Sequence, residues 1–392
     1  MRPVARCLIM GAADHTPLVD LCIGVNRLAW RSTRPGELVG SLGRTTVEKR
    51  DMETQDQVHV HGPGDVRIDQ VPVPQAGAQD VVVRVASCGI CGSDVGYVKA
   101  GGLMGPASEP MPLGHELSGI LESVGADVEG WRVGDRVVVD PMGSNNMIGN
   151  GGGEGGFTPR LLVRGVAKGE GLIRVPEGLS LSMAALAEPL GVGMRAVDRS
   201  RAAAGEKVVV MGAGPIGLAA VACLVDRGVE DVVAVDFSDT RLELAVRLGA
   251  RAGLNAGSAE LWSELKVLHG TTSMMGMPVV ATDIFIEATG AGPAFCQLVS
   301  QARGEARIVV VGLHKAPVEV NLVDVMMKEL DLLGSIAQPA DWNRMLDLLA
   351  RRDLSAMVTH QFPLAEFQSG FSVAKDPSAG GKVMIEVDSD LD

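Results

Sequence analysis

Three kinds of metal-binding side chain lie in the first half of the chain. Cys91 stands in the run Cys88–Asp94, and His115 follows it by twenty-four residues in Gly-His-Glu, next to Glu116. A further acid, Glu188, lies between an alanine and a proline. Thiolate, imidazole and carboxylate are ligands that tetrahedral Zn²⁺ accepts, and three protein ligands with one open position form a catalytic zinc site. These residue types indicate metal chemistry.

The spacing alone leaves other interpretations open. A single histidine such as His115 is more often a hydrogen-bonded core residue, and Cys91 alone is more often a small buried hydrophobe. Cys88 and Cys91 also form a Cys-x-x-Cys pair. In redox proteins such a pair belongs to a thioredoxin-like unit, and the sequence shows none here.

A second motif predicts a bound dinucleotide. The residues Val208–Met211 read as a strand, and Gly212-Ala213-Gly214-Pro215-Ile216-Gly217 leads from it into a helix of small residues. Gly212 allows the tight turn, Gly214 allows close approach of the pyrophosphate, and Gly217 allows helix and strand to pack closely. The helix N-terminus, with Pro215 and Ile216, then faces the phosphates.

The second strand of this unit ends on an acid. Asp236 lies nineteen residues beyond Gly217, after the run Val232–Val235. A carboxylate there accepts the two ribose hydroxyls and repels a 2'-phosphate, which favours NAD over NADP.

The same stretch contains no charged residue from Val208 to Val225. These eighteen residues reach the lower length limit of a membrane-spanning helix. Three glycines and a proline in its first ten residues would break such a helix. We therefore interpret it as a buried strand followed by a buried helix.

The composition excludes several classes of protein. A chain of 392 residues with 46% hydrophobic and 21% charged residues is ordinary for a globular protein of two domains. A net charge of −13 argues against a nucleic-acid partner or an anionic membrane surface. Six scattered cysteines are too few for a disulfide framework in a chain of this size, so we expect a reducing, cytoplasmic location.

The first 51 residues differ from the rest. They carry eight Lys or Arg against five Asp or Glu, a balance of +3, so the remainder carries −16. The apolar run after Arg6 is too short for a secretory signal, and Asp14 follows it. We expect residues 1–51 to be a poorly ordered extension without chemistry, with Met52 opening the folded part.

The remaining sequence divides into two parts with different patterns of predicted secondary structure. Short β-branched runs punctuated by Gly and Pro predict a mostly β domain over residues 52–197, completed by residues 340–392. Alternating strands and helices over residues 198–339 predict a doubly wound parallel sheet. The expected strands of the first part are Val81–Val85, Leu117–Val124, Arg136–Val139, Leu161–Val163 and Lys382–Val387. Those of the second are Val208–Val210, Val232–Val235, Ile284–Glu287, Arg307–Val311 and Leu332–Gly334, with a helix at Thr240–Leu248 between them. The last segment, from about Ala340, carries a helix pattern at Trp342–Leu349 before its final strand.

Five motifs in this order resemble the zinc-containing medium-chain dehydrogenase family, in particular its sorbitol, polyol and threonine dehydrogenase branch. They are Gly-Ile-Cys-Gly-Ser-Asp at 89–94, Gly-His-Glu at 114–116, Gly-Asp-Arg-Val at 134–137, Ala-Glu-Pro-Leu at 187–190 and Gly-Ala-Gly-Pro-Ile-Gly at 212–217. The resemblance covers Val58 to Val387. It implies an α/β fold in which a GroES-like, mostly β catalytic domain joins a Rossmann NAD-binding domain.

The resemblance also implies a metal site. Cys91 and His115 are expected to ligate one catalytic zinc, with Glu116 and Glu188 sharing the carboxylate role either directly or through water; which of the two touches the metal stays open. Asp94 is expected to orient the His115 ring.

Two further residues receive roles from the resemblance. Ser93 is expected to take the substrate's proton. Lys382 is expected near the cofactor pyrophosphate, although a solvated lysine at a strand edge is nearly as good an interpretation.

The sequence departs from the family in two places. No cysteine occurs between Cys91 and Cys223, so we expect no structural zinc. The loop Met142–Phe157 is glycine-rich instead, either a flexible connection or a rim over the active site. Gly96 stands where many relatives carry the histidine that ends a proton relay, and Tyr97 matches a tyrosine that lines the pocket of sorbitol dehydrogenases.

The function expected from these observations is hydride transfer between NAD and a secondary alcohol or polyol, or the corresponding ketone. The zinc would lower the pKa of the substrate hydroxyl as a Lewis acid. Two alternatives remain: a zinc-independent NAD(P)H reductase of the same fold, and a non-catalytic NAD-binding protein. Relatives are usually dimers or tetramers, so we expect a homo-oligomer.

Overall fold

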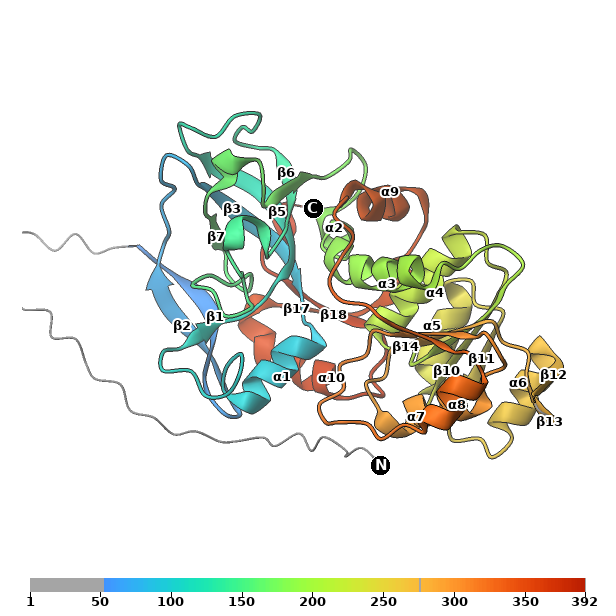
Figure 1. Cartoon of the computed structure of the whole chain (residues 1–392). Coiled ribbons are helices and arrows are strands. Elements are labelled where there is room, and N and C mark those ends of the chain that lie inside the picture. The colour runs from blue at the N-terminus through green and yellow to red at the C-terminus, as the bar shows by residue number, and fades with distance from the viewer. Residues whose placement is uncertain (1–52, 275, 392) are drawn as a thin grey trace, which may run out of the picture. The chain divides into compact units, whose positions relative to one another are not determined.

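The strand that ends just before Cys91 lies in the middle of a seven-stranded sheet (Figure 1). The computed structural model describes residues 53–274 and 276–391. The sheet order is β17-β18-β3-β5-β6-β8, and β7 also pairs with β3. Its strands are β3 (Val81–Gly89), β5 (Glu116–Val124), β6 (Arg136–Val139), β7 (Arg160–Val163), β8 (Leu172–Arg174), β17 (Val358–Pro363) and β18 (Lys382–Glu386). The predicted strands of the first part are therefore confirmed.

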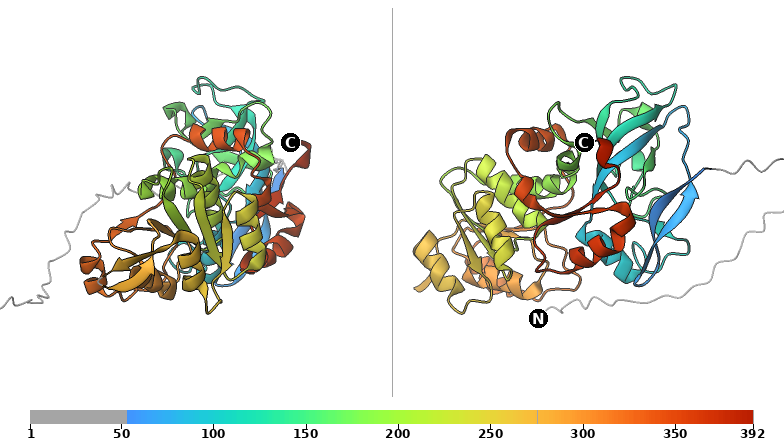
Figure 2. Two further views of the ribbon diagram at one scale, coloured as in Figure 1. Left: turned by 90° about the vertical axis from the view of Figure 1, so that its right-hand side faces the viewer. Right: turned by 180° about the vertical axis from the view of Figure 1, so that it is seen from behind.

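The C-terminal segment returns to this sheet, as the sequence predicted. β18 pairs antiparallel with β3, so that Ile385 lies opposite Cys88. The helix α10 (Phe367–Lys375) connects β17 with β18 and buries Phe367 and Phe371 in the same core as Val83. Both further views show this C-terminal segment against the first strands of the chain (Figure 2).

Smaller elements complete this part of the molecule. A three-stranded sheet contains β1 (Thr54–Gly62), β2 (Asp65–Pro72) and β4 (Met111–Pro112). The short helices are α1 (Gly92–Ala100), α2 (Leu181–Ala184), and the 3-10 turns η1 (Gly143–Asn145), η2 (Val166–Lys168), η3 (Ser355–Met357), η4 (Leu364–Glu366) and η5 (Ser389–Leu391). Of these, α1 carries the residues that follow Cys91.

The second sheet is parallel throughout and has the order β11-β10-β9-β14-β15-β16. The strands are β9 (Lys207–Met211), β10 (Asp231–Asp236), β11 (Ala252–Asn255), β14 (Ile284–Glu287), β15 (Arg307–Val310) and β16 (Asp331–Gly334). The helices are α3 (Ala187–Ser200), α4 (Pro215–Asp226), α5 (Asp239–Arg247), α6 (Leu261–His269), α7 (Gly292–Gln301), α8 (Leu322–Met327) and α9 (Asn343–Arg351). This is the predicted doubly wound sheet. Its strand order reverses between β9 and β14, where such sheets bind ligands.

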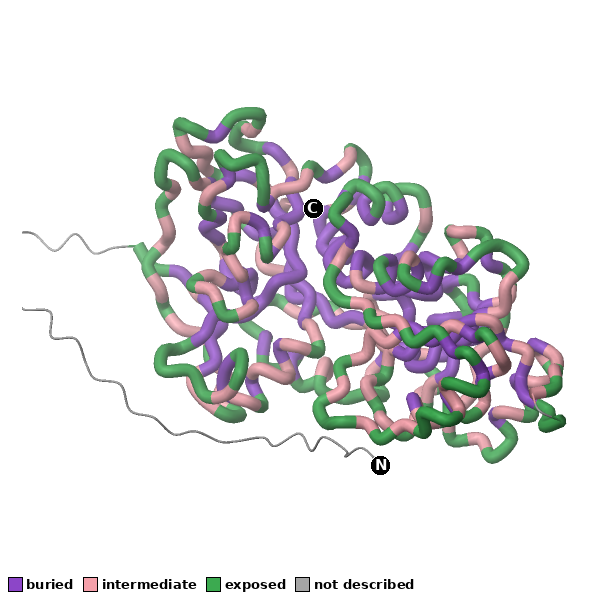
Figure 3. Tube along the Cα trace, in the orientation of Figure 1, coloured by how far each residue is buried: buried purple, intermediate pink, exposed green. Residues whose placement is uncertain are grey.

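The uncharged stretch Val208–Val225 forms β9 and α4, as expected. Its residues are nearly all buried, because β9 is a central strand and α4 packs on it. Buried segments run through both sheets in Figure 3. Within the described residues, no helix has both the length and the apolar character needed to cross a membrane.

Two features differ from the sequence analysis. A hairpin of β12 (Thr271–Met274) and β13 (Met277–Val280) lies between α6 and β14, and the sequence analysis did not anticipate it. The predicted domain boundary at 197/198 falls inside α3, which packs against α4. The expectation for residues 1–51 and Met52 lies outside the described residues.

Candidate active site

The helix α1 begins at the candidate zinc ligand Cys91, which is its N-cap residue. The Asp94 carboxylate reaches back, and its Oδ2 accepts the Cys91 N–H at 2.8 Å. This contact satisfies a backbone donor that the helix itself leaves unpaired. The Asp94 Oδ1 faces the second ligand, lying 3.6 Å from His115 Nδ1. Asp94 thus links the two segments.

His115 and Glu116 reach the same place through strand pairing. The register of β3 and β5 puts Glu116 opposite Gly89, two residues before Cys91. The metal-binding atoms of Cys91, His115 and Glu116 all lie within 4.8 Å of one another. Within residues 53–274 and 276–391, these three form the one group of this kind. Glu188 lies outside it.

Lys382 has a different place from the one predicted. It is 2% exposed, and its Nζ donates to Glu116 Oε1 at 2.6 Å and to the Ile90 carbonyl at 3.1 Å. It is therefore neither a solvated strand-edge lysine nor a residue of the nucleotide pocket described below. The physical reason is the buried Glu116 carboxylate, which is stable in the interior only with a partner of opposite charge.

Glu188 lies in the first turn of α3 and is 7% exposed. Its Oε1 accepts a hydrogen bond from Gln338 Nε2, a residue that the sequence analysis did not select. Burial raises the pKa of Glu188 to about 7, and the nearby charges of Glu116 and Asp94 raise it as well. The charges of His115 and Lys382 act in the opposite direction.

Zinc fits this group of side chains. Sulfur, nitrogen and oxygen donors converge, and all of them lie within 4.8 Å of one another in a largely buried position. Three buried carboxylates, Asp94, Glu116 and Glu188, share one buried lysine. This excess of buried negative charge favours a bound cation. Burial opposes protonation of His115, but Asp94 and Cys91 outweigh it and raise the pKa of the imidazole well above its ordinary value.

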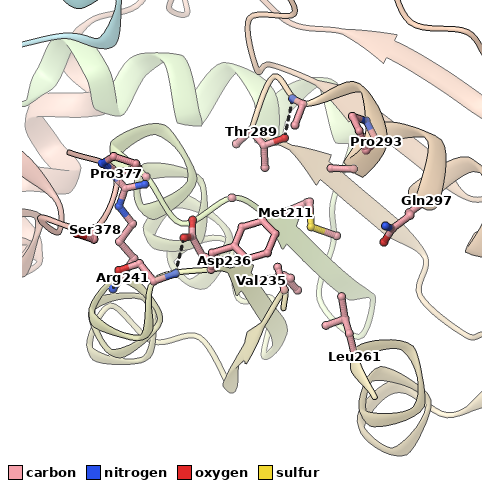
Figure 4. Close-up of a pocket in the computed structure, with 18 residues that line it drawn as sticks. Met211, Val235, Asp236, Arg241, Leu261, Thr289, Pro293, Gln297, Pro377 and Ser378 are labelled. Carbon is pink, nitrogen blue, oxygen red and sulfur yellow. Dashed lines mark hydrogen bonds between the residues drawn. The ribbon is translucent and has the colours of Figure 1, made fainter. Parts of the chain in front are cut away.

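A cavity of about 650 Å³ opens at the reversal of strand order in the parallel sheet. Gly212 and Gly214 line it at the end of β9, and Asp236 lines it at the end of β10. Figure 4 shows Asp236, Arg241 and Ser378 on one side of the cavity and Pro293 and Gln297 on the other. Glycines at a turn, an acid at the next strand end and apolar walls suit a dinucleotide.

The predicted phosphate-binding turn has the expected backbone. Gly212 has φ +98°, a left-handed value that favours glycine. A Cβ on Gly217 would lie 1.8 Å from the Gly212 carbonyl oxygen, so only glycine fits there. Pro215 is the first residue of α4 and Gly214 its N-cap, with Ile216 following in the first turn. Asp236 Oδ2 accepts the Ala213 N–H at 2.7 Å, which holds the turn beside β10.

Comparisons with known proteins cover most of the chain. Residues 77–176 match the alcohol dehydrogenase GroES-like domain, and residues 215–351 match the zinc-binding dehydrogenase domain. Human sorbitol dehydrogenase is 31% identical over 355 residues, which span 84% of this chain and 95% of the human protein. The chain belongs to the zinc-binding alcohol dehydrogenase family. Its resemblance to the sorbitol and polyol branch is thereby confirmed.

Solved structures agree with this family. The 2R,3R-butanediol dehydrogenase of Bacillus subtilis has a TM-score of 0.74 at 28% identity, covering 85% of this chain and 100% of that one. A protein described as a short chain alcohol dehydrogenase from E. coli CFT073, in complex with NADH, has a TM-score of 0.73 at 26% identity. That match covers 85% of this chain and 99% of the E. coli chain.

Ser93, Gly96 and Tyr97 follow Cys91 on the helix α1. Ser93 Oγ lies 3.4 Å from His115 Nε2. Gly96, on α1, has open space where a side chain would be. Tyr97 is half-buried next to it and donates a hydrogen bond to Asn150 Oδ1 at 3.0 Å. Burial, helped by the charges of Asp94 and Cys91, raises the Tyr97 pKa, so the phenol keeps its proton.

The glycine-rich loop Met142–Phe157 packs directly on the metal-binding segment. Cβ atoms on Gly149 and Gly155 would lie 2.3 Å from the Gly114 carbonyl oxygen and 2.4 Å from the Leu113 carbonyl oxygen. The lack of side chains at these glycines lets the two backbones approach closely. Together with the contact of Asn150 with Tyr97, this packing favours the interpretation of the loop as a rim over the candidate active site rather than as a flexible connection.

Two residues at the family's two sites were missed by the sequence analysis. Gln338 belongs to no recognisable motif, and 150 positions in the sequence separate it from Glu188, which it contacts. Arg241 lines the nucleotide cavity close to Gly214 and donates to the Gly380 carbonyl at 2.8 Å. Its position five residues after Asp236 is the signal that could have identified it.

Proposed function

We propose that this protein is an NAD-dependent zinc dehydrogenase that interconverts a secondary alcohol or polyol and the corresponding ketone. The observation that carries the proposal is the cluster of Cys91, His115 and Glu116, whose donor atoms lie within 4.8 Å of one another. The family and its polyol-oxidising relatives support the same reaction class.

Cys91, His115 and Glu116 would hold one catalytic zinc. When bound, zinc supplies Lewis acidity that lowers the pKa of the substrate hydroxyl. Asp94 orients His115 from the side of Nδ1, which leaves Nε2 for the metal. Glu188 would act through a water or by moving closer, since it lies outside the cluster of three. Lys382 balances the Glu116 charge.

The proton leaves through the chain's own hydroxyls. Ser93 accepts it from the substrate and passes it toward solvent, because Gly96 supplies no imidazole. Tyr97, held by Asn150, lines the route. The serine is therefore the catalytic hydroxyl, together with the ligands Cys91, His115 and Glu116.

We propose NAD as the nucleotide, held by Gly212, Gly214, Pro215, Ile216, Gly217 and Asp236. When bound, NAD would supply a nicotinamide ring as the hydride acceptor. The Asp236 carboxylate would accept the ribose hydroxyls and disfavour a 2'-phosphate. Arg241 lies where a phosphate contact is needed and takes over the role that the sequence assigned to Lys382.

The domain division follows from these roles. We propose residues 52–197 with 340–392 as the catalytic domain and residues 198–339 as the NAD-binding domain. We also propose a cytoplasmic location, because Cys91 can serve as a thiolate ligand only where thiols stay reduced.

The deciding experiment combines metal content with turnover. Zinc-loaded protein should form NADH from secondary alcohols or polyols, and removal of zinc with a chelator should abolish this. Cys91→Ala should lose both zinc and activity, whereas NAD affinity should change less than about twofold, because the nucleotide cavity does not include Cys91. Cys296→Ala, a cysteine in α7, is the matched control.

The outcomes distinguish the alternatives. Full activity in metal-free protein would indicate the zinc-independent reductase. NAD binding without turnover on any alcohol, polyol or ketone would indicate a non-catalytic protein. Either result contradicts the proposal.

We further propose a homo-oligomer. The edge strand β16 pairs only with β15, and the neighbouring α8 exposes Leu322 (71%), Val323 (60%) and Met326 (64%). An open strand edge beside an apolar helix face is suited to a second copy. Sedimentation equilibrium should give a multiple of 40.9 kDa, and Met326→Lys should shift the mass toward the monomer. A monomeric wild-type protein contradicts this.

A further inference from the structure

Gln338 connects the parallel sheet with the candidate zinc site. It lies between β16 and α9, four residues beyond the end of the edge strand. Its side-chain Nε2 donates to Oε1 of Glu188, in the first turn of α3. A carboxylate with one oxygen engaged in this way has a defined orientation and keeps its second oxygen for a metal or a water.

The helix α3 has a space for this glutamine. Gly191 lies one turn after Glu188 on α3, where side chains three residues apart share a face. A Cβ on Gly191 would lie 2.6 Å from Gln338 Cγ and 2.8 Å from Gln338 Cβ. Because neither distance is tolerable, any other residue at 191 would push Gln338 away from Glu188.

The backbone before Gln338 is strained. Ala337 has φ +57°, a left-handed conformation that is unfavourable for an alanine because its Cβ crowds the backbone. Ile336, on the other side of this turn, is 87% exposed. Ile336 is thus exposed to solvent and Ala337 is strained at the point where the backbone turns the Gln338 side chain inward. Such strain persists only where the surrounding structure requires it.

Gln338 also separates Glu188 from an open cavity. This cavity of about 700 Å³ is lined by Gln338 together with Met142 and Trp342, among others. Glu188, on the other side of the glutamine, is 7% exposed and does not line the cavity. A shorter side chain at 338 would admit water to the carboxylate.

We propose that Gln338 is a positioning residue for the zinc site. It orients the Glu188 carboxylate by donating to Oε1, and it excludes the water of the adjacent cavity from that carboxylate. Through it, the segment that leaves the NAD-binding sheet is joined to the metal-binding side chains. The inference rests on the proposed function, because it assumes that zinc binds at Cys91, His115 and Glu116.

The first experiment measures zinc affinity by competition with a chelator at constant pH. Gln338→Met keeps the length of the side chain and removes the amide. We expect it to weaken zinc binding about 10-fold, the lower end of the effect of removing a residue that supports a metal ligand. The absorption spectrum of the Co²⁺-substituted protein should change as well. Gln368→Met is the matched control, because Gln368, on α10, donates to the Val66 carbonyl and should leave both readouts unchanged.

The effect of Gln338→Met on zinc affinity must act through Glu188. In a Glu188→Ala background, Gln338→Met should cause no further loss of zinc affinity, since the acceptor of its hydrogen bond is gone. Gly191→Ala provides a second route that keeps Gln338 itself. It should lower zinc affinity like Gln338→Met.

Three results would overturn the inference. The first is a folded Gln338→Met protein with unchanged zinc affinity and an unchanged Co²⁺ spectrum. The second is a loss of zinc affinity on Gln338→Met that is as large in the Glu188→Ala background as in the wild-type protein, and the third is wild-type zinc affinity in Gly191→Ala. If Gln338→Met does not fold, the Gly191→Ala variant decides alone. Failure of the proposed function is a different result, in which Cys91→Ala binds zinc as tightly as the wild-type protein does.

Discussion

Cys88 and Cys91 are three residues apart, yet their surroundings give them different chemistry. Burial raises the pKa of the Cys88 thiol well above its ordinary value, and the charges of Asp94 and Glu116 raise it further. Cys88 therefore stays a neutral core residue. Cys91, at the N-cap of α1, is partly exposed, and its sulfur lies with the donor atoms of His115 and Glu116. The complete burial of Cys88 in the core argues against the redox pair considered from the sequence, because such a pair must be accessible to its partner.

At the scale of one residue, we propose that Asp236 controls the choice of nucleotide. Besides the Ala213 contact, its Oδ1 accepts the Ser238 N–H at 2.9 Å, so the carboxylate is fixed at the end of β10. Asp236→Ala should weaken NAD binding about 10-fold, equivalent to about 1.4 kcal/mol, and should weaken NADP binding less or improve it. Fluorescence titration with both nucleotides measures this. An unchanged ratio of the two affinities would show that Asp236 does not read the ribose.

At the scale of elements, strand register creates the candidate zinc site. The pairing of β3 with β5 places Glu116 opposite Gly89, and the pairing of β18 with β3 brings Lys382 to the same end. A Cβ on Gly89 would lie 2.2 Å from Glu116 Oε2, so glycine gives the carboxylate its space. A shift of one residue in either pair would turn these side chains to the opposite face.

The junction between β9 and α4 depends on Gly217. Gly217→Ala places a methyl group on the Gly212 carbonyl oxygen, and the turn must move to accommodate it. We expect NAD affinity to fall at least 10-fold and stability to fall by about 1–3 kcal/mol. Isothermal titration and chemical denaturation measure the two effects. Gly334→Ala, in the edge strand β16 with open space around it, is the control and should leave NAD affinity unchanged.

At the scale of the whole molecule, two buried histidines make stability depend on pH. Burial is the largest cause that lowers the pKa values of His59 and His269 from the ordinary 6.5. The unfolded chain therefore takes up these protons at higher pH than the folded chain does. The stability that the neutral rings provide is fully present above pH 6.5 and is lost as the pH falls through their folded pKa values.

This direction of the pH dependence of stability can be tested on His269. The charged groups around His269 are Asp231, Lys207, Arg251 and Asp283. Lowering the pH from 7.5 to 5.5 should change the Tm of the wild-type protein more unfavourably than that of His269→Gln. The comparison with the variant is needed because the raised pKa values of His115 and Glu188 act in the opposite direction over the same pH range. His360→Gln, at a half-buried histidine on β17, should retain the wild-type difference. An identical difference in all three proteins would contradict the role of His269.

The sequence by itself determined the central strands of both sheets and the ordered motifs. The turn from Gly212 to Gly217, the acid at Asp236 and the strands around Cys91 and His115 follow from local rules, because periodicity and glycine spacing depend on near neighbours in the chain. Tertiary structure decided the partners. Lys382 meets Glu116 across 266 positions and Gln338 meets Glu188 across 150, and no local pattern encodes such distances. Buried charges select whatever partner the fold brings to them, and only the folded chain shows which partner that is.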